Sequence, residues 1–382
     1  MKPGRFPGRL LIFSSLLLRL PGQFIRRKPQ PSQVMRILVL HQFLLGDALM
    51  ATSLLAKLRQ QFPQAQIILA CPPAQAALYR SRPYGVEPLG WHPRDFASLR
   101  CLFALPRFDL VYLMGENRLS FLARALGARW IVGFAGEAPA YKNWLVDQAV
   151  PYSSEPAAWT DTAATLVDGP APRCFRLEDW PLDPLTQIEL PEHYVVLHVG
   201  ASSATRFWPE ENWRQLAMWV RSRGRRVLWS CGPGEQRLIE ALEPSADDLV
   251  MAGNLSLGQL RTVLARADAC VCPDTGIAHL AKIADAALVM LFGPGSEVLF
   301  GASSFFANGR CIGVGPAWFP CRNQRSVHYR DVDWALRCFR PHGAPPRGCA
   351  RALCMQAIEC EPVITALKRL ITDQVTVALA PK

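Results

Sequence analysis

The sequence predicts an α/β protein with two domains, each built around a parallel sheet. At 382 residues the chain is too long for one hydrophobic core of ordinary size. Hydrophobic residues make up 50% of it and charged residues 19%, which is typical of a globular protein. Apolar runs that suit buried strands alternate with segments of helical periodicity in two series, and the proline-rich residues 150–190 connect the series.

The first series begins with residues 35–43, MRILVLHQF, a continuous apolar run that suits a strand buried on both faces. Residues 47–63 follow with apolar positions at helical spacing. Further strands are expected at 64–72, 109–115 and 129–134.

The second series repeats this alternation, and Gly224 is expected to end its first helix. Ligands of parallel sheets bind at the carboxyl ends of the strands, so we expect tandem domains that enclose a ligand cleft. Strands are expected at 194–200, 225–232, 268–274 and 288–294, and helices at 208–224, 257–267 and 277–286. The expected division is an extension over 1–34, a first domain over 35–185, a second over 186–355, and a closing helix and tail over 356–382.

The N-terminal extension is basic and apolar. The chain carries a formal net charge of +11, which suits anionic partners. The apolar run from Leu10 to Leu18 has arginines on both sides and is shorter than the roughly 20 residues that a membrane-spanning helix needs. The run either lies in a membrane interface, with its arginines on anionic headgroups, or is a disordered extension, or results from a mis-chosen start codon upstream of Met35.

Twelve cysteines make a disulfide framework possible on number, but their positions favour reduced thiols. Most of them, such as Cys270 and Cys272, lie in apolar strand-like runs, as buried reduced cysteines of cytosolic proteins do. The exceptions are in an Arg- and Pro-rich stretch, where structural or incidental roles are favoured over a zinc site or a redox pair. They are Cys321, Cys338, Cys349 and Cys354.

Polar residues follow several of the predicted strands. After strand 35–43, Gly46 permits close approach of a ligand, and Asp47 is either a helix N-cap or a catalytic acid or base. After strand 194–200, Ser202, Ser203 and Arg206 offer hydroxyls and a cation, which favours a phosphate site over an ordinary loop with a capping serine.

Two further strand ends carry acidic residues. Glu235 follows Gly232 and Gly234 in SCGPGE, where it either complements a helix dipole or holds ribose hydroxyls. Strand 268–274 ends at Asp274, and a helix that faces an anion is expected to start at the next residues. The alternative is a helix cap with a satisfied histidine. The residues of this fourth cluster are Asp274, Thr275, Gly276 and His279.

The chain from Met35 to about Leu370 resembles glycosyltransferase family 9, the heptosyltransferases that build the inner core of bacterial lipopolysaccharide. Four motifs carry the resemblance in order: GDALMATSLLAKLRQQFPQAQI, GASSATRFWPEENW, GPGE and PDTGIAHLAKIADAALVMLFGP. The resemblance implies a GT-B fold, with two Rossmann-like domains facing a cleft. The first would hold the acceptor and the second the nucleotide-sugar.

The resemblance also implies roles for individual residues. Asp47 matches the proposed catalytic base, on an acceptor-side loop that includes Gly46, and Glu235 matches an acid associated with the nucleoside. Ser202, Ser203 and Arg206 match positions at the donor's phosphates, and Asp274, Thr275, Gly276 and His279 match the signature around the diphosphate and sugar. Charge on the leaving nucleoside diphosphate could be stabilised by Arg206 and the helix start without a metal ion, so none is expected.

Several residues depart from the family pattern. Asp285 replaces a usual glycine, Ala287 a proline and Gly295 a threonine, while Arg206 replaces a lysine. Aspartate tolerates a left-handed conformation, so Asp285 is compatible with the fold. The missing threonine hydroxyl removes one candidate ligand of the donor, and arginine presents a planar fork to a phosphate. Both changes bear on which donor binds more than on the fold.

The leading hypothesis is an inverting transferase that moves heptose from ADP-heptose to a lipid-linked core acceptor. It would be cytoplasmic and peripheral on the inner face of the inner membrane. One alternative is a family member with another nucleotide-sugar or acceptor, and a second is an inactive binding relative. Nucleic-acid binding is disfavoured because the basic residues are scattered.

Overall fold

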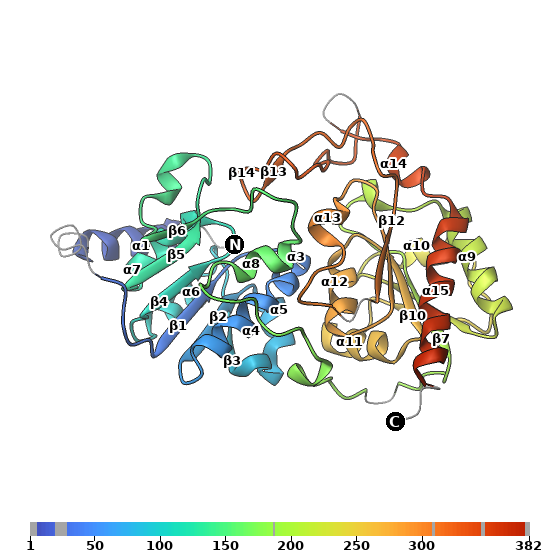
Figure 1. The fold of residues 1–382 in the computed structure, drawn as a ribbon, viewed down its shortest axis with the longest axis horizontal. Helices are drawn as coiled ribbons and strands as arrows, with labels where there is room; N and C mark the ends of the chain where they lie inside the picture. The colour runs from blue at the N-terminus through green and yellow to red at the C-terminus, as the bar shows by residue number, and fades with distance from the viewer. Residues whose placement is uncertain (1–5, 20–28, 186–187, 308–309, 345–347, 379–382) are drawn as a thin grey trace. The chain divides into compact units, whose positions relative to one another are not determined.

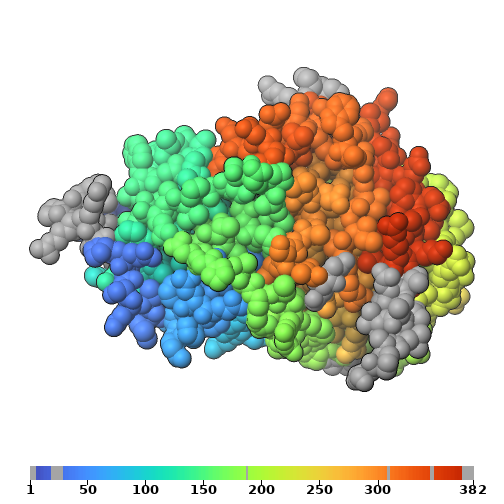
Figure 2. Space-filling model, viewed as in Figure 1, coloured from blue at the N-terminus to red at the C-terminus, as the bar shows by residue number. Residues whose placement is uncertain are grey.

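The computed structural model describes residues 6–19, 29–185, 188–307, 310–344 and 348–378. The chain forms two compact units (Figure 1). Figure 2 shows the surface, with residues outside the described ranges in grey. The N-terminal unit comprises Met1–Glu155, Trp159–Arg173 and Ser326–Asp333, and the C-terminal unit comprises Pro156–Ala158, Cys174–Arg325 and Trp334–Lys382.

The N-terminal unit is built on a parallel six-stranded sheet in the order β3-β2-β1-β4-β5-β6. In β1, Val39 lies opposite Leu69 of β2 and Tyr112 of β4, and the strand is buried from Ile37 onward. This order is that of a Rossmann sheet, whose ligands bind where the strand order reverses, between β1 and β4. The strands are β1 Arg36–Leu40, β2 Gln66–Cys71, β3 Val86–Gly90, β4 Leu110–Leu113, β5 Trp130–Phe134 and β6 Gln148–Val150.

Helices cover this sheet and bury apolar side chains against it. Leu99 and Leu102 of α6 join Leu122 of α7 and Phe108 in one core cluster. The helices are α1 Phe6–Arg19, α3 Leu45–Met50, α4 Thr52–Gln61, α5 Pro73–Ala76, α6 Phe96–Phe103, α7 Ser120–Ala125 and α8 Trp159–Ala164. Short 3-10 helices span Leu78–Ser81, Pro83–Gly85, Asn117–Leu119 and Ala140–Asn143.

Helix α1 has two apolar faces. Leu11 and Ile12 pack against the core cluster of the N-terminal unit, and Leu16 is buried. Residues 6–19 are therefore helical, and the expected disordered extension is wrong for them. The other face exposes apolar side chains at helical spacing: Phe6, Leu10, Phe13 and Leu17. In the described part of the chain, no helix is long and apolar enough to cross a membrane, and residues 1–5 and 20–28 lie outside that part.

The C-terminal unit repeats the Rossmann order. Its parallel six-stranded sheet runs β12-β11-β10-β7-β8-β9, so the reversal falls between β7 and β10. The strands are β7 Tyr194–His198, β8 Arg226–Cys231, β9 Leu249–Ala252, β10 Ala269–Pro273, β11 Leu288–Leu291 and β12 Cys311–Val314. The helices are α9 Glu210–Ser222, α10 Gln236–Glu240, α11 Leu257–Arg266, α12 Gly276–Ile283, α13 Glu297–Phe300, α14 Leu353–Gln356 and α15 Cys360–Ala378, with 3-10 helices at Leu177–Asp179 and Ala204–Arg206.

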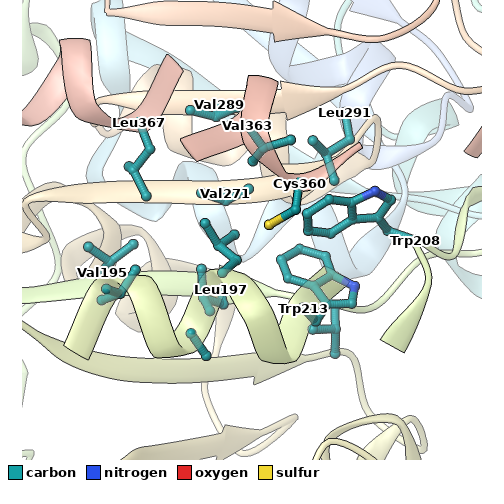
Figure 3. Packing of buried hydrophobic residues seen from close by; sticks show 14 of the residues in the cluster. Val195, Leu197, Trp208, Trp213, Val271, Val289, Leu291, Cys360, Val363 and Leu367 are labelled. Atoms are coloured by element: carbon teal, nitrogen blue, oxygen red, sulfur yellow. The ribbon is translucent and has the colours of Figure 1, made fainter. Parts of the chain in front are cut away.

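The core of this unit lies between its sheet and helices α9 and α15 (Figure 3). The rings of Trp208 and Trp213 meet edge to face, with centroids 4.9 Å apart. Trp208 Nε1 donates to the carbonyl of Ile358 at 2.8 Å, which ties the start of α9 to the approach of α15. Gly224, at φ 71°, follows the end of α9 as expected, because glycine adopts the left-handed conformation at no steric cost.

A hairpin late in the chain belongs to the N-terminal unit. It consists of β13 Ser326–Val327 and β14 Arg330–Asp331. The side chain of Arg330, which is 3% exposed, donates to the carbonyls of Gly115, Phe134 and Ala135 at 2.7, 3.0 and 2.9 Å. The hairpin thus lies at the ends of β4 and β5. The expected division placed these residues in the second domain, 186–355.

Several elements are absent from the sequence prediction. Edge strands β3, β6, β9 and β12 were not expected, and α8 lies inside the expected connection 150–190.

All twelve cysteines are free, and Cys270 and Cys272 are fully buried, as the sequence predicts.

Candidate functional site

The predicted donor residues lie at the reversal point of the C-terminal sheet. Because β7 and β10 are neighbours, the loop that begins at Gly200 and the turn at Asp274 leave the same edge of the sheet. The first carries Ser202, Ser203 and Arg206, and the second leads into α12.

Ser203 caps a short 3-10 helix. Its Oγ accepts from Thr205 N at 3.4 Å and lies 2.9 Å from Thr205 Oγ1. Ser203 is thus a capping serine, which was the alternative to a phosphate ligand. Ser202 is exposed and Arg206 is half-buried.

Glu235 joins two loops of the site. Its carboxylate accepts from Ala201 N at 3.2 Å and from Gly232 N at 2.8 Å. A Cβ at Gly200 would lie 2.1 Å from Glu235 Oε2, so a side chain there would displace the Glu235 carboxylate. Glu235 therefore fixes the loop after β7 against the loop after β8, a role that its position in the sequence did not indicate.

The turn into α12 holds buried polar groups. Thr275 is the N-cap residue, but its side chain makes no capping hydrogen bond. Among the described residues, Thr275 Oγ1 and His279 Nδ1 are buried without a hydrogen-bond partner. The purely structural alternative, a threonine that caps the helix and a histidine with all its hydrogen bonds made, is therefore not observed. Each such atom calls for an explanation, and a ligand bound at this turn is one.

His279 is held neutral by its surroundings. Its side chain is 4% exposed, and Nε2 lies 3.9 Å from Asp274 Oδ1. Burial, followed by the charges of Lys282 and Arg206, lowers the pKa of His279 well below its ordinary value. The charge of Arg206 thus acts on a residue far away in the sequence. The structure therefore brings the two predicted donor motifs into one electrostatic environment.

Two departures from the family pattern have local explanations. A Cβ at Gly295 would lie 2.0 Å from Asp274 Oδ2, so Asp274 in this position leaves no room for a threonine. Asp285 has φ 54°, a left-handed conformation that aspartate tolerates, so it is compatible with the fold as expected.

Asp47 lies at the reversal point of the N-terminal sheet, just after β1. It is the third residue of α3, whose N-cap is Leu44, so the N-cap interpretation of Asp47 is wrong. The Asp47 side chain is 27% exposed. Burial lowers the pKa of neighbouring His41 to about 3, against the opposing charge of Asp47, so His41 is neutral.

Sequence reasoning missed His328, the residue that faces Asp47. His328 lies at the tip of the hairpin 326–331, and its Nε2 is 3.7 Å from Asp47 Oδ1. Trp159 Nε1 donates to the carbonyl of Asp47 at 3.2 Å. No motif marks these residues, since each reaches Asp47 from a distant part of the chain.

No group of three or more His, Cys, Asp or Glu side chains in the described ranges is arranged to hold a metal ion. This includes the four cysteines of the basic segment, for which a zinc site was the minor alternative.

Two Rossmann-ordered sheets, each with polar residues at its reversal point, define a protein of the GT-B type. The chain belongs to glycosyltransferase family 9 (heptosyltransferase), whose family profile matches residues 104–327.

Known proteins support this membership. Lipopolysaccharide heptosyltransferase 1 of Pseudomonas aeruginosa is 30% identical over 194 residues, which are 46% of this chain and 54% of that protein. The match thus spans about half the length of this relative. The structure of the family 9 glycosyltransferase from Veillonella parvula is similar in fold, with a TM-score of 0.69 at 15% identity, over 91% of this chain and 100% of that one. An Escherichia coli heptosyltransferase solved with ADP has a TM-score of 0.61 at 20% identity, over 71% and 92% of the two chains.

Proposed function

We propose that this protein is an inverting glycosyltransferase that transfers heptose from ADP-heptose to the inner core of lipopolysaccharide. The observation that carries the proposal is the cluster at the start of α12. There, buried polar atoms of Thr275 and His279 lack partners in the described structure, and the charge of Arg206 acts on His279. The names of the relatives, and the ADP bound to one solved neighbour, support the donor.

The donor chemistry requires stabilisation of a leaving diphosphate. As the bond from the anomeric carbon to ADP breaks, negative charge grows on the phosphate oxygens. The guanidinium of Arg206, the first N–H groups of α12 and the hydroxyl of Thr275 are suited to receive it. Because His279 is neutral, one of its ring nitrogens can donate a hydrogen bond and the other can accept one. The proposal uses no metal ion.

The acceptor chemistry is assigned to Asp47. Its carboxylate takes the proton of the acceptor hydroxyl as the oxygen attacks the anomeric carbon and ADP departs. A single displacement of this kind inverts the anomeric configuration. The partial exposure of Asp47 and its place at the reversal point of the sheet support this role.

Two alternatives make different predictions. A transferase with another nucleotide-sugar would agree with the altered positions Arg206 and Gly295. An inactive relative would agree with binding but no transfer, although the acids Asp47, Glu235 and Asp274 are all present.

Calorimetry with ADP-heptose, ADP, UDP-glucose and GDP-mannose tests the donor, with Asp47→Ala as the matched variant. We expect the adenine ligands alone to bind both proteins, and only the wild type to transfer heptose to a heptose-free core acceptor. Binding of UDP-glucose or GDP-mannose instead would reject the donor. Binding without transfer by the wild type would favour the inactive relative.

We also propose that the protein is cytoplasmic and contacts the inner face of the inner membrane through α1. The exposed apolar stripe Phe6, Leu10, Phe13 and Leu17, with exposed Arg9 beside it, suits a lipid interface with anionic headgroups. Phe13→Ser should weaken sedimentation with phosphatidylglycerol vesicles, whereas Met218→Ser, which changes an exposed apolar residue of α9, should not. Equal sedimentation of both variants with the wild type would reject the contact.

A further inference from the structure

The hairpin 326–331 places an imidazole beside the proposed catalytic base. We propose that His328 is a positioning residue for Asp47, so that a segment from the late part of the chain completes the acceptor-side half of the site. This inference rests on the proposed function. Nothing in the motif pattern assigns a role to His328.

The imidazole of His328 has a fixed orientation. Its ring centroid lies 4.4 Å from that of Trp159 and 4.9 Å from that of Phe43, and 14% of its side chain is exposed. Nδ1 is buried, while Nε2 is the nitrogen that lies 3.7 Å from Asp47 Oδ1. A ring packed against two aromatic side chains cannot turn away from the carboxylate without breaking this packing.

The neighbouring backbone is shaped to admit the ring. A Cβ at Gly115 would lie 2.3 Å from the ring of Phe43 and 3.2 Å from Cγ of His328. Gly115 follows β4, on the opposite side of the reversal point from Asp47. Only glycine at this position allows the two rings and the loop to pack together.

The turn itself is held in an unfavourable conformation. His328 and Tyr329, the two central residues of the hairpin, have φ 47° and 63°, where glycine and asparagine are preferred. Arg330 keeps the turn in place, since it also donates to the carbonyl of His328 at 2.7 Å, and Ala138 N donates to the carbonyl of Tyr329 at 2.9 Å. Strain that the surrounding structure maintains in this way is typical of functional sites.

His328 restrains one oxygen of Asp47. Its Nε2 lies 3.7 Å from Oδ1, which restricts rotation of the carboxylate. Ionisable groups near the pair include His41, which is neutral and directly follows β1, and buried Arg330, which donates to the carbonyl of His328. His328 therefore acts through Asp47 and not on the sugar.

The first test compares His328→Gly, which suits the left-handed backbone, with the control Tyr329→Gly, which relieves the same turn but keeps the imidazole. In heptose transfer we expect His328→Gly to lower kcat at least tenfold, with KM for ADP-heptose unchanged and thermal stability kept. Added imidazole should restore activity, and His328→Gln, which keeps an N–H near Asp47, should lose less. Full activity of His328→Gly, or a loss that neither imidazole nor glutamine repairs, would overturn the inference.

The second test does not depend on transfer. The ring nitrogen resonances of His328 should shift when Asp47 is replaced by Asn, and should stay in place in Met218→Ser. Unchanged resonances in Asp47→Asn would overturn the pairing. A wild type that binds no adenine nucleotide and transfers no sugar would instead reject the proposed function, and the resonances would still decide whether the two side chains interact.

Discussion

Replacing Arg330 by Met should release the hairpin 326–331 and reduce the stability of the N-terminal unit. Arg330 is buried, and its guanidinium donates to three carbonyls at the ends of β4 and β5 and lies 3.7 Å from Glu137. Burial lowers the pKa of Arg330, and the charge of Glu137 opposes this change. In the variant, those carbonyls would lose their hydrogen-bond donor, and less positive charge would balance the negative charge of Glu137.

The cost can be estimated from these contacts. Removing one partner of a buried ion pair costs about 3–5 kcal/mol. Lys142 Nζ still pairs with Glu137 Oε1 at 2.9 Å, and a detached hairpin would let water reach the carbonyls. We therefore expect the lower end, about 3 kcal/mol of unfolding free energy.

Urea unfolding and hydrogen exchange measure this effect, with Arg94→Met, an exposed arginine of the same unit, as the control. In Arg330→Met the amides of residues 326–331 should lose protection, since local opening costs less free energy. ADP binding should persist, because the proposed donor residues belong to the other unit. A loss below about 0.5 kcal/mol with protected hairpin amides would refute the reasoning, since ordinary surface substitutions change stability by that much.

Three further outcomes are expected. Tyr329→Gly should raise the unfolding free energy by about 1 kcal/mol, because a left-handed residue with a side chain is strained, and urea unfolding would show it. His41 has a folded pKa of about 3 against an ordinary value of 6.5, so the unfolded state binds the extra proton and stability should fall as pH drops from 6.5 towards 3. The loss is about 1.4 kcal/mol per pH unit, and a His41→Gln variant should show a shallower slope. Gly295→Thr should weaken ADP binding in calorimetry, because its Cβ would force Asp274 to move; unchanged affinity would count against the position given to Asp274.

The sequence predicted those parts of the fold that have strong local signals. The buried runs that became β1 and β10 have continuous apolar residues, and the polar cluster from Asp274 to His279 followed its strand as expected. Strands β6, β9 and β12 were missed because three or four residues carry too little pattern, and the five residues of β3, VEPLG, include a glutamate and a proline.

The parts of the site that were missed depend on contacts between distant residues. His328 lies in a segment without motif or periodicity. Its role follows only from its contact with Asp47, which is far away in the chain. Asp47 was interpreted as a possible N-cap because its place near a helix start was visible, whereas the boundary at Leu44 was not. Glu235 was associated with the donor, and its hydrogen bonds to two loops could only be seen in three dimensions.

The return of residues 326–333 to the N-terminal unit also affects how the protein is made and how it can be recombined. During synthesis, the carbonyls of Gly115, Phe134 and Ala135 lack their donor Arg330 until most of the other unit, residues 174–325, has been made. The acceptor-side half would thus mature late, although its sheet is encoded first. An exchange of units between relatives would have to move two separate stretches of coding sequence, since a graft that ended at Arg173 would leave His328 and its turn behind.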